Sequence, residues 1–314
     1  MKRPVGFGAV LLGLTLFSTV SAQTEIRLGY QRGDFAAVMM EQGLLEARFG
    51  PDVTVTWTLF TSGPPMLEAL AAGSIDFART GDTPPIFAQA AGTPFVYAGA
   101  QQAVTREAIV VPEDSDIEGV ADLEGRTVAY SPGSSAHYFT VQALGTVNLA
   151  LDDIESVPLQ PADARAAFQG GSLDAWAVWD PFMTAAQVEL GARVVLTRDD
   201  VGGEYDFYLA SQAFAEENPE LVAGVLEEYN RAVGWAESNP EDFSALLEAD
   251  TGIDRAVWQE SLSGRTFHQL TPVTPDIVES QQAAADTLAD LGLIPGPVTV
   301  ADNVWTWEAQ EAAR

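Results

Sequence analysis

The stretch Thr80-Gly81-Asp82-Thr83-Pro84-Pro85 lies between a predicted strand and a predicted helix. The stretch Ser131-Pro132-Gly133-Ser134-Ser135-Ala136-His137-Tyr138 follows another predicted strand and also opens a helix. A strand–turn–helix junction directs unbonded backbone N–H groups, and the positive end of a helix dipole, at one point. That arrangement suits a tetrahedral oxyanion. Two such junctions, from two halves of one chain, predict a clamp for a small anion.

Around both junctions, short β-rich runs alternate with helical stretches, an order that predicts mostly parallel sheets covered by helices. The first run has expected strands at 25–30, 53–60, 75–80 and 95–100, with helices at 36–47, 66–72 and 86–91. The second has expected strands at 107–111, 127–130, 175–178 and 194–196, with helices at 136–144, 162–168 and 182–190. A strand at 207–211 is expected to return to the first sheet, followed by helices at 220–237, 242–249, 255–262 and 277–291.

This order predicts an α/β fold of two lobes, each a mostly parallel sheet flanked by helices. The first lobe is expected to comprise residues 23–104 and 206–314, and the second lobe residues 105–205. The two crossings, at 101–106 and 201–206, are the expected hinges. Because ligands of open parallel sheets bind beyond the carboxyl ends of the strands, the residues at those ends are expected to share one site.

The first 22 residues have the pattern of a secretory signal peptide. Lys2 and Arg3 precede an apolar run at 5–17, and Val20-Ser21-Ala22 has the small residues of a cleavage site. A membrane anchor is the alternative, but the apolar run is shorter than the ~20 residues that a spanning helix needs. The mature protein is therefore expected to be soluble and periplasmic.

Composition excludes several classes of protein. The formal net charge of −30 opposes binding to nucleic acid or to an anionic membrane. The chain has no cysteine, so it has no thiolate nucleophile and no cysteine-ligated metal. Its one lysine is Lys2, inside the predicted signal peptide, which excludes Schiff-base chemistry and a Walker A loop in the mature chain.

Each candidate binding group also has an ordinary structural explanation. Thr80, Gly81 and Asp82 offer a hydroxyl, a close backbone approach and N–H groups ahead of a helix, but they equally suit a plain turn with a helix cap. Ser134 and Ser135 have the same ambiguity. His137, just inside the helix, favours a ligand site because imidazole can donate a hydrogen bond to a ligand oxygen, although a packed histidine is the alternative.

Two tryptophans lie three positions apart in the strand Asp174-Ala175-Trp176-Ala177-Val178-Trp179-Asp180-Pro181. Positions three apart on a strand point to opposite faces. One ring is therefore expected to enter the core, and Trp179, at the strand's tip, is the better candidate for a wall of the cleft.

Catalytic and metal-binding arrangements are poorly represented in the sequence. There is no Gly-x-Ser-x-Gly elbow, and two distant histidines cannot build a histidine-rich metal site. We therefore expect no enzyme activity, no cofactor and no metal.

With these residues in place, the chain resembles the substrate-binding proteins of aliphatic-sulfonate and taurine ABC importers over nearly its whole mature length. The resemblance rests on these segments: Leu28-Gly29-Tyr30-Gln31, Met66-Leu67-Glu68-Ala69-Leu70, Thr80-Gly81-Asp82-Thr83-Pro84-Pro85, Gly133-Ser134-Ser135-Ala136-His137, Pro161-Ala162-Asp163-Ala164-Arg165 and Asp174-Ala175-Trp176-Ala177-Val178-Trp179-Asp180-Pro181.

The resemblance implies a type II-like periplasmic-binding-protein fold that closes on a small organosulfonate and delivers it to a permease in the inner membrane as a monomer. By the same resemblance, Gln31, Thr80, Gly81 and Asp82 would meet the ligand from the first lobe. Ser134, Ser135 and His137 would meet it from the second, with Trp179 beside its organic part. Neutral, preorganised donors would then hold an anion despite the acidic surface.

The segment Glu204-Tyr205-Asp206-Phe207 departs from the alkanesulfonate pattern and resembles taurine binders, which carry a carboxylate at the position aligned with Asp206. Asp206 could therefore face the ammonium group of taurine. The segment at 80–85, by contrast, resembles the alkanesulfonate branch, so both ligand types stay open.

Two alternatives to a sulfonate-binding protein are considered, one with another ligand and one that is an enzyme. A binding protein of the same fold could take nitrate, bicarbonate or a pyrimidine. A thiamin-pyrimidine synthase, an enzyme that shares the two-lobed fold, would need a lysine-bound cofactor and a cysteine-rich segment, and the mature chain has neither.

Overall fold

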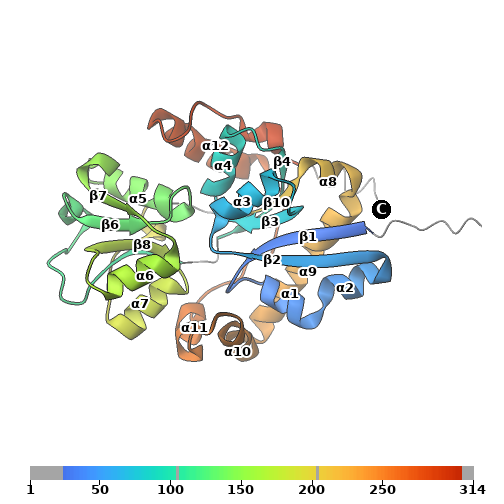
Figure 1. Ribbon diagram of the computed structural model, residues 1–314, viewed down its shortest axis with the longest axis horizontal. Helices are drawn as coiled ribbons and strands as arrows, with labels where there is room; N and C mark the ends of the chain where they lie inside the picture. Colours follow the sequence, from blue (N-terminus) through green and yellow to red (C-terminus); the bar gives the residue numbers. More distant parts are fainter. Residues whose placement is uncertain (1–23, 104–105, 203–204, 306–314) are drawn as a thin grey trace, which may run out of the picture.

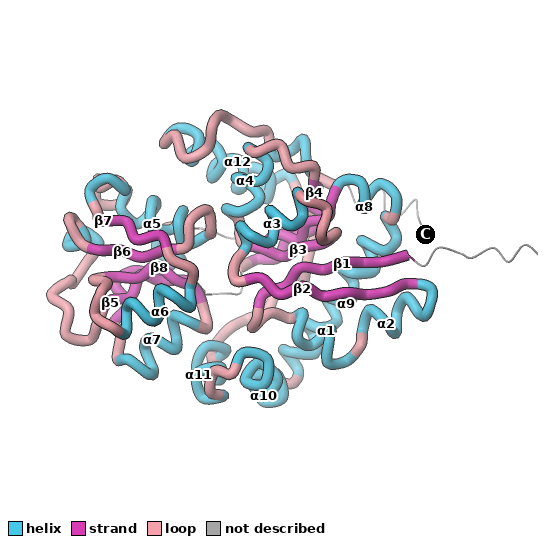
Figure 2. Tube along the Cα trace, in the orientation of Figure 1, coloured by secondary structure: helices cyan, strands magenta, loops and turns pink. Residues whose placement is uncertain are grey.

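The computed structural model describes residues 24–103, 106–202 and 205–305, which form two five-stranded sheets with helices packed outside them (Figure 1). The predicted signal peptide, residues 1–22, lies outside the described residues. In the tube view the strands of the two sheets form separate blocks, with the helices around them (Figure 2). The protein is therefore a two-lobed α/β molecule, as the sequence predicts.

The first sheet has the strand order β2-β1-β3-β10-β4. Its strands are β1 (Thr24–Gln31), β2 (Val53–Phe60), β3 (Phe77–Thr80), β4 (Phe95–Gln102) and β10 (Tyr205–Ser211). β1 pairs in parallel with β2 and β3, whereas β10 runs antiparallel to both of its neighbours. The returning strand thus lies inside the sheet, between β3 and β4.

The second sheet has the order β7-β6-β8-β5-β9. Its strands are β5 (Glu107–Val111), β6 (Thr127–Tyr130), β7 (Glu155–Pro158), β8 (Ala175–Trp179) and β9 (Arg193–Thr197). β5 is its single antiparallel member. β5 and β10 are each the first strand after the chain passes from one sheet to the other. The chain leaves each sheet at the carboxyl ends of its parallel strands, and these ends face the other sheet. The first strand of the other sheet therefore starts at that sheet's carboxyl edge and runs antiparallel to its neighbours.

Helices cover both faces of each sheet. Their bounds are α1 (Ala36–Gln42), α2 (Leu44–Phe49), α3 (Gly63–Ala71), α4 (Thr83–Ala90), α5 (Ser135–Gly145), α6 (Pro161–Gln169), α7 (Phe182–Leu190), α8 (Gln212–Glu217), α9 (Pro219–Ser238), α10 (Pro240–Thr251), α11 (Arg255–Leu262) and α12 (Pro275–Asp290). One core of the first lobe packs α1, α2 and α9 against its sheet, and the other packs α3, α4 and α12. In the second lobe, α5 covers one face and α6 and α7 cover the other.

The structure differs from the expected elements at α1–α2, at β7 and at α8 (Gln212–Glu217), which was not expected either. The helix expected at 36–47 is two helices, α1 and α2, because Gly43 between them adopts the left-handed conformation with φ 58°. β7 was not expected. It lies at an edge of the second sheet, where it pairs only with β6, and an edge strand tolerates the proline at its end.

One C-terminal helix reaches the second lobe. α11 packs against α7 and lies beneath the space between the lobes (Figure 1). The chain then returns to the first sheet, where Thr271 bridges Ala100 on β4. No helix in the described ranges is long and apolar enough to cross a membrane.

Candidate ligand-binding site

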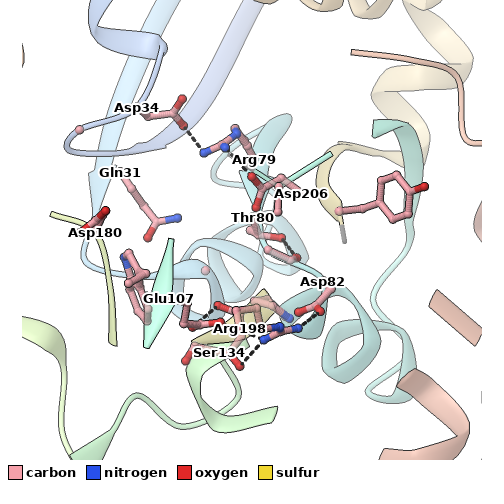
Figure 3. Close-up of a pocket in the computed structure, with 18 of the residues that line it drawn as sticks. Gln31, Asp34, Arg79, Thr80, Asp82, Glu107, Ser134, Asp180, Arg198 and Asp206 are labelled. Carbon is pink, nitrogen blue, oxygen red and sulfur yellow. Dashed lines mark hydrogen bonds and ion pairs between the residues drawn. The ribbon is translucent and has the colours of Figure 1, made fainter. Parts of the chain in front are cut away.

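A cavity opens between the two sheets, at the carboxyl ends of their parallel strands (Figure 3). Gln31 at the end of β1, Thr80 at the end of β3 and Trp179 at the end of β8 all line it. The turns that begin α4 and α5 line it too, as do the segment after β1 and residues of both crossings. The topology therefore brings the strand ends together, as expected for open parallel sheets.

The cavity brings together eight of the nine residues that the sequence predicted as ligand contacts. These eight lining residues are Gln31, Thr80, Gly81, Asp82, Ser134, Ser135, Trp179 and Asp206. Trp176 is fully buried in the core of the second lobe while Trp179 is half-buried at the cavity, so the expected division of the two tryptophans is confirmed.

His137 is the ninth, and it is not among the residues that line the cavity. Its Nδ1 accepts a hydrogen bond from the Gly133 N–H at 3.2 Å, and its ring stacks on that of Tyr130 with centroids 4.8 Å apart. Burial lowers its pKa, which favours a neutral imidazole. In this geometry His137 fixes the turn that carries Ser134 and Ser135.

The two junctions touch each other across the cavity. A Cβ atom added at Gly81 would lie 3.2 Å from the Cβ of Ser135, closer than most real contacts of this kind. The N–H groups of Asp82, at the start of α4, and Ser135, the first residue of α5, have no acceptor among the described residues. Two helix N-termini from different lobes therefore present open donors to one small volume, which favours an anion.

The hydroxyl groups at the site already donate hydrogen bonds inside the protein. Thr80 Oγ1 donates to the Gly81 carbonyl at 3.0 Å, Ser134 Oγ to the Ser131 carbonyl at 2.7 Å, and Ser135 Oγ to Glu107 Oε1 at 3.0 Å. Main-chain N–H groups are thus the better-prepared donors. Pro84 and Pro85 in the first turn of α4 contribute none, because proline lacks an N–H.

The cavity is strongly charged, which the sequence analysis did not anticipate. Its lining holds three arginines and five carboxyl groups: Arg32, Asp34, Arg79, Asp82, Glu107, Asp180, Arg198 and Asp206. Most are buried, so they are paired within the protein.

Arg79 on β3 joins two carboxylates at one end of the cavity (Figure 3). Its Nη2 donates to Asp206 Oδ2 at 2.7 Å, and its Nη1 donates to Asp34 Oδ2 at 3.4 Å. Burial opposes the charge on this guanidinium, yet Asp206 and Asp34 raise the pKa of Arg79 above its usual value. Asp206 therefore lines the cavity as expected, but its carboxylate is already engaged by an arginine.

A second group lies below the two junctions. Arg198 pairs with Asp82 from the first lobe and with Glu107 from the second. Burial raises the pKa of Glu107 to about 7, against the opposing effect of Arg198. The Asp82 side chain thus belongs to this ion pair, and only its backbone is open to a ligand.

A third group lies where α11 meets the second lobe. Asp180 accepts hydrogen bonds from Thr184 within its own lobe, from Ser261 on α11 at 3.1 Å, and from Arg265. Arg106, after the first crossing, also pairs with it at 3.3 Å. Asp180 is therefore a polar contact point between the lobes.

These charged residues were missed in the sequence. Arg79 and Glu107 stand in otherwise apolar strands, and a charge inside a buried strand is a usable signal because it must find a partner there. Arg198 gave no such signal, since it precedes Asp199-Asp200 in a stretch typical of a solvated turn.

Comparison with known proteins agrees with this architecture. The family described as NMT1/THI5 like matches residues 60–243. A putative aliphatic sulfonates-binding protein of Escherichia coli (strain K12) is 40% identical over 302 residues, covering 94% of each chain. The chain belongs to this family. The solved structure of the alkanesulfonate-binding protein SsuA from Xanthomonas axonopodis pv. citri, bound to MOPS, is 37% identical with a TM-score of 0.87, covering 90% of this chain and 98% of that one.

A protein named for a different ligand, taurine, is also similar to this chain. The taurine-binding periplasmic protein of Escherichia coli (strain K12) is 32% identical over 174 residues, which cover 54% of this chain and 53% of that protein. The similarity to the sulfonate binders spans almost the whole chain, whereas the similarity to the taurine binder covers about half of it.

Proposed function

We propose that this protein is an extracytoplasmic receptor that captures a small organosulfonate between its lobes and delivers it to an ABC importer. One observation carries the proposal: Asp82 and Ser135 line one cavity from two helix N-termini, and their N–H groups have no acceptor among the described residues. A sulfonate has three oxygens that bear its charge and can accept from both sides. The names of the relatives support a sulfonate over other anions.

In this proposal the ligand is bound and released without a chemical change. Except for Arg32, the charged residues that line the cavity are engaged in ion pairs within the protein, and among the described residues none is poised beside an activated nucleophile. The relatives are binding proteins, which supports the same view.

The contacts we propose for the ligand follow the cavity lining. Backbone N–H groups of Gly81, Asp82 and Ser135 would meet the sulfonate, and Gln31 and Thr80 would complete its polar surroundings. Trp179 would pack beside the organic part. Since His137 supports the turn from behind, its replacement would act through that turn.

The remaining proposals concern the whole protein. We assign residues 23–104 and 206–314 to the first lobe and 105–205 to the second, with hinges in the two crossings. Cleavage after Ala22 would release a periplasmic monomer, and its partner would be the permease of the importer in the inner membrane.

The test is a calorimetric titration of the mature protein with ethanesulfonate, taurine, nitrate and bicarbonate. We expect binding of at least one sulfonate, no comparable binding of the inorganic anions, and recovery of the unchanged sulfonate after prolonged incubation. Release of sulfite or an aldehyde would contradict a binding protein. Preference for nitrate or bicarbonate would move the protein to another ligand class of this fold.

A further inference from the structure

Arg198 connects parts of the molecule that are otherwise separate. It lies in the short 3-10 turn at Arg198–Asp200, just before the second crossing, and its side chain is 9% exposed. Its Nε donates to the Gly202 carbonyl at 2.8 Å, and its Nη1 donates to Glu107 Oε2 at 2.9 Å and to the Ser135 carbonyl at 3.2 Å. Its Nη2 donates to Asp82 Oδ2.

These four acceptors come from four functionally distinct places. Asp82 is the N-cap residue directly before α4, and Ser135 is the first residue of α5. Glu107 begins β5, immediately after the first crossing, and Gly202 lies at the second crossing. One guanidinium therefore holds both helix N-termini and the flanks of both crossings. Figure 3 shows Arg198 with two of these partners, Asp82 and Glu107.

Stability alone does not account for such a group. Burying an arginine and two carboxyl groups costs desolvation free energy, and their mutual attraction offsets that cost only in good geometry. Proteins in which apolar residues replace such a buried ion pair are often as stable as the original. The bond to Asp82 also exists only while the lobes are together, because Asp82 belongs to the first lobe and Arg198, Glu107 and Ser135 to the second. Its formation is thus tied to closure of the cleft.

We propose that Arg198 is a positioning residue for ligand binding: it aligns the N-termini of α4 and α5 in the closed form so that their open N–H groups meet the same anion. The inference rests on the proposed function. Lysine cannot replace arginine in this role, because an ammonium group lacks the planar fork that reaches four acceptors in fixed directions.

The test compares Arg198→Lys with Arg193→Lys, using ethanesulfonate as the probe. Arg193 lies five residues earlier on β9 and also bonds several main-chain carbonyl groups, those of Glu113, Ser115 and Ile117, but away from the cavity. We expect Arg198→Lys to raise the dissociation constant about tenfold or more, as for the loss of a well-placed charged hydrogen bond. Arg193→Lys should leave it unchanged even if both variants melt at similarly lowered temperatures.

The second variant is Asp82→Asn, which removes the cross-lobe ion pair and keeps the Asp82 N–H. It should also weaken binding, mainly through faster dissociation, and the double variant should be no weaker than Arg198→Lys alone because both changes break one interaction. Small-angle scattering should show that ethanesulfonate compacts the wild type more than Arg198→Lys. If Arg198→Lys does not fold, the titration of Asp82→Asn still tests the proposal.

Unchanged affinity in both Arg198→Lys and Asp82→Asn would overturn the role of Arg198, as would an equal loss in Arg193→Lys. Failure of the wild type to bind ethanesulfonate or taurine would instead overturn the proposed function, and the inference with it. The wild-type titration and the comparison among variants thus report on separate claims.

Discussion

Asp206 lies in the cavity, where the sequence predicts it, but its carboxylate is paired with an arginine that the sequence analysis did not identify as its partner. It lines the cavity, but Arg79 binds it at 2.7 Å. Arg79 also pairs with Asp34, whose Oδ1 is buried with no hydrogen-bond partner among the described residues. A ligand ammonium at this end of the cavity would have that oxygen as an acceptor and the carboxylate of Asp206 close by.

We therefore predict that the wild type binds taurine about tenfold more tightly than ethanesulfonate, since a desolvated charged hydrogen bond is worth roughly 1.5–3 kcal/mol. In Asp206→Asn one of the two carboxylates is lost, and the preference should fall toward unity. Paired calorimetric titrations measure the ratio. Asp116→Asn, which alters an exposed carboxylate paired with Arg126, serves as the control and should keep the wild-type ratio. A wild type that prefers ethanesulfonate would rule out an ammonium partner here.

Glu107 gives a second residue-level prediction, on pH. Burial raises its pKa from the usual 4.5 to about 7 in the folded protein. Between these two values the unfolded chain loses the proton while the folded protein keeps it. Glu107 therefore contributes stability that is fully present below about pH 4.5 and is lost as the pH rises toward 7, on the order of 3 kcal/mol at most.

The measurement is the thermal midpoint of wild type and Glu107→Gln at pH 5 and pH 8. Glutamine stays neutral throughout, so the difference between the two proteins isolates Glu107 from the other carboxyl groups. The wild type should lose more stability than the variant between the two pH values. Parallel changes in both proteins would mean that Arg198 keeps Glu107 ionised in the folded state.

At the scale of elements, hydrophobic periodicity located most of the strands and helices and the two junctions, because those features depend on short-range patterns. Periodicity could not reveal the break at Gly43, since the residues on either side continue a helical pattern and only the left-handed backbone separates α1 from α2. The carboxylate partners of Arg79 and Arg198 were also out of reach, because they lie more than 40 residues away in sequence and are set by how the strands and lobes meet.

The contact between the two junctions supplies the element-level prediction. Gly81 lies against Ser135, so Gly81→Val should hold the N-termini of α4 and α5 apart. We expect weaker sulfonate binding with little change in the thermal midpoint of the ligand-free protein, because the clash arises mainly in the closed form. Calorimetry and thermal denaturation test the two parts.

Gly119→Val is the matched control, since a Cβ there would meet no atom within 4 Å and its backbone is extended, with φ −158°. Equal loss of affinity in both variants would argue that the junctions do not need to touch for binding.

At the scale of the whole molecule, the ligand must approach a chain of formal net charge −30. The sequence predicts this long-range field, but it does not predict the local one, which depends on which arginines the fold brings to the cavity. Arg32 lines the cavity, is exposed, and makes no hydrogen bond or ion pair with another described residue. Its field is short-ranged in salt, as is that of each surface carboxylate, with a screening length of about 8 Å at 0.15 M.

The negative net charge should slow the association of an anionic ligand, whereas Arg32 should speed it. We expect the net charge to dominate. Ethanesulfonate is an anion, so salt should screen its repulsion and raise its association rate between about 10 mM and 150 mM ionic strength. Taurine has no net charge and should associate at nearly the same rate throughout, which makes it the matched control. Stopped-flow tryptophan fluorescence can follow both ligands, because Trp179 lines the cavity. A rate for ethanesulfonate that falls with salt, and loses that dependence in Arg32→Gln, would show instead that a single arginine at the mouth of the cavity outweighs the charge of the whole surface.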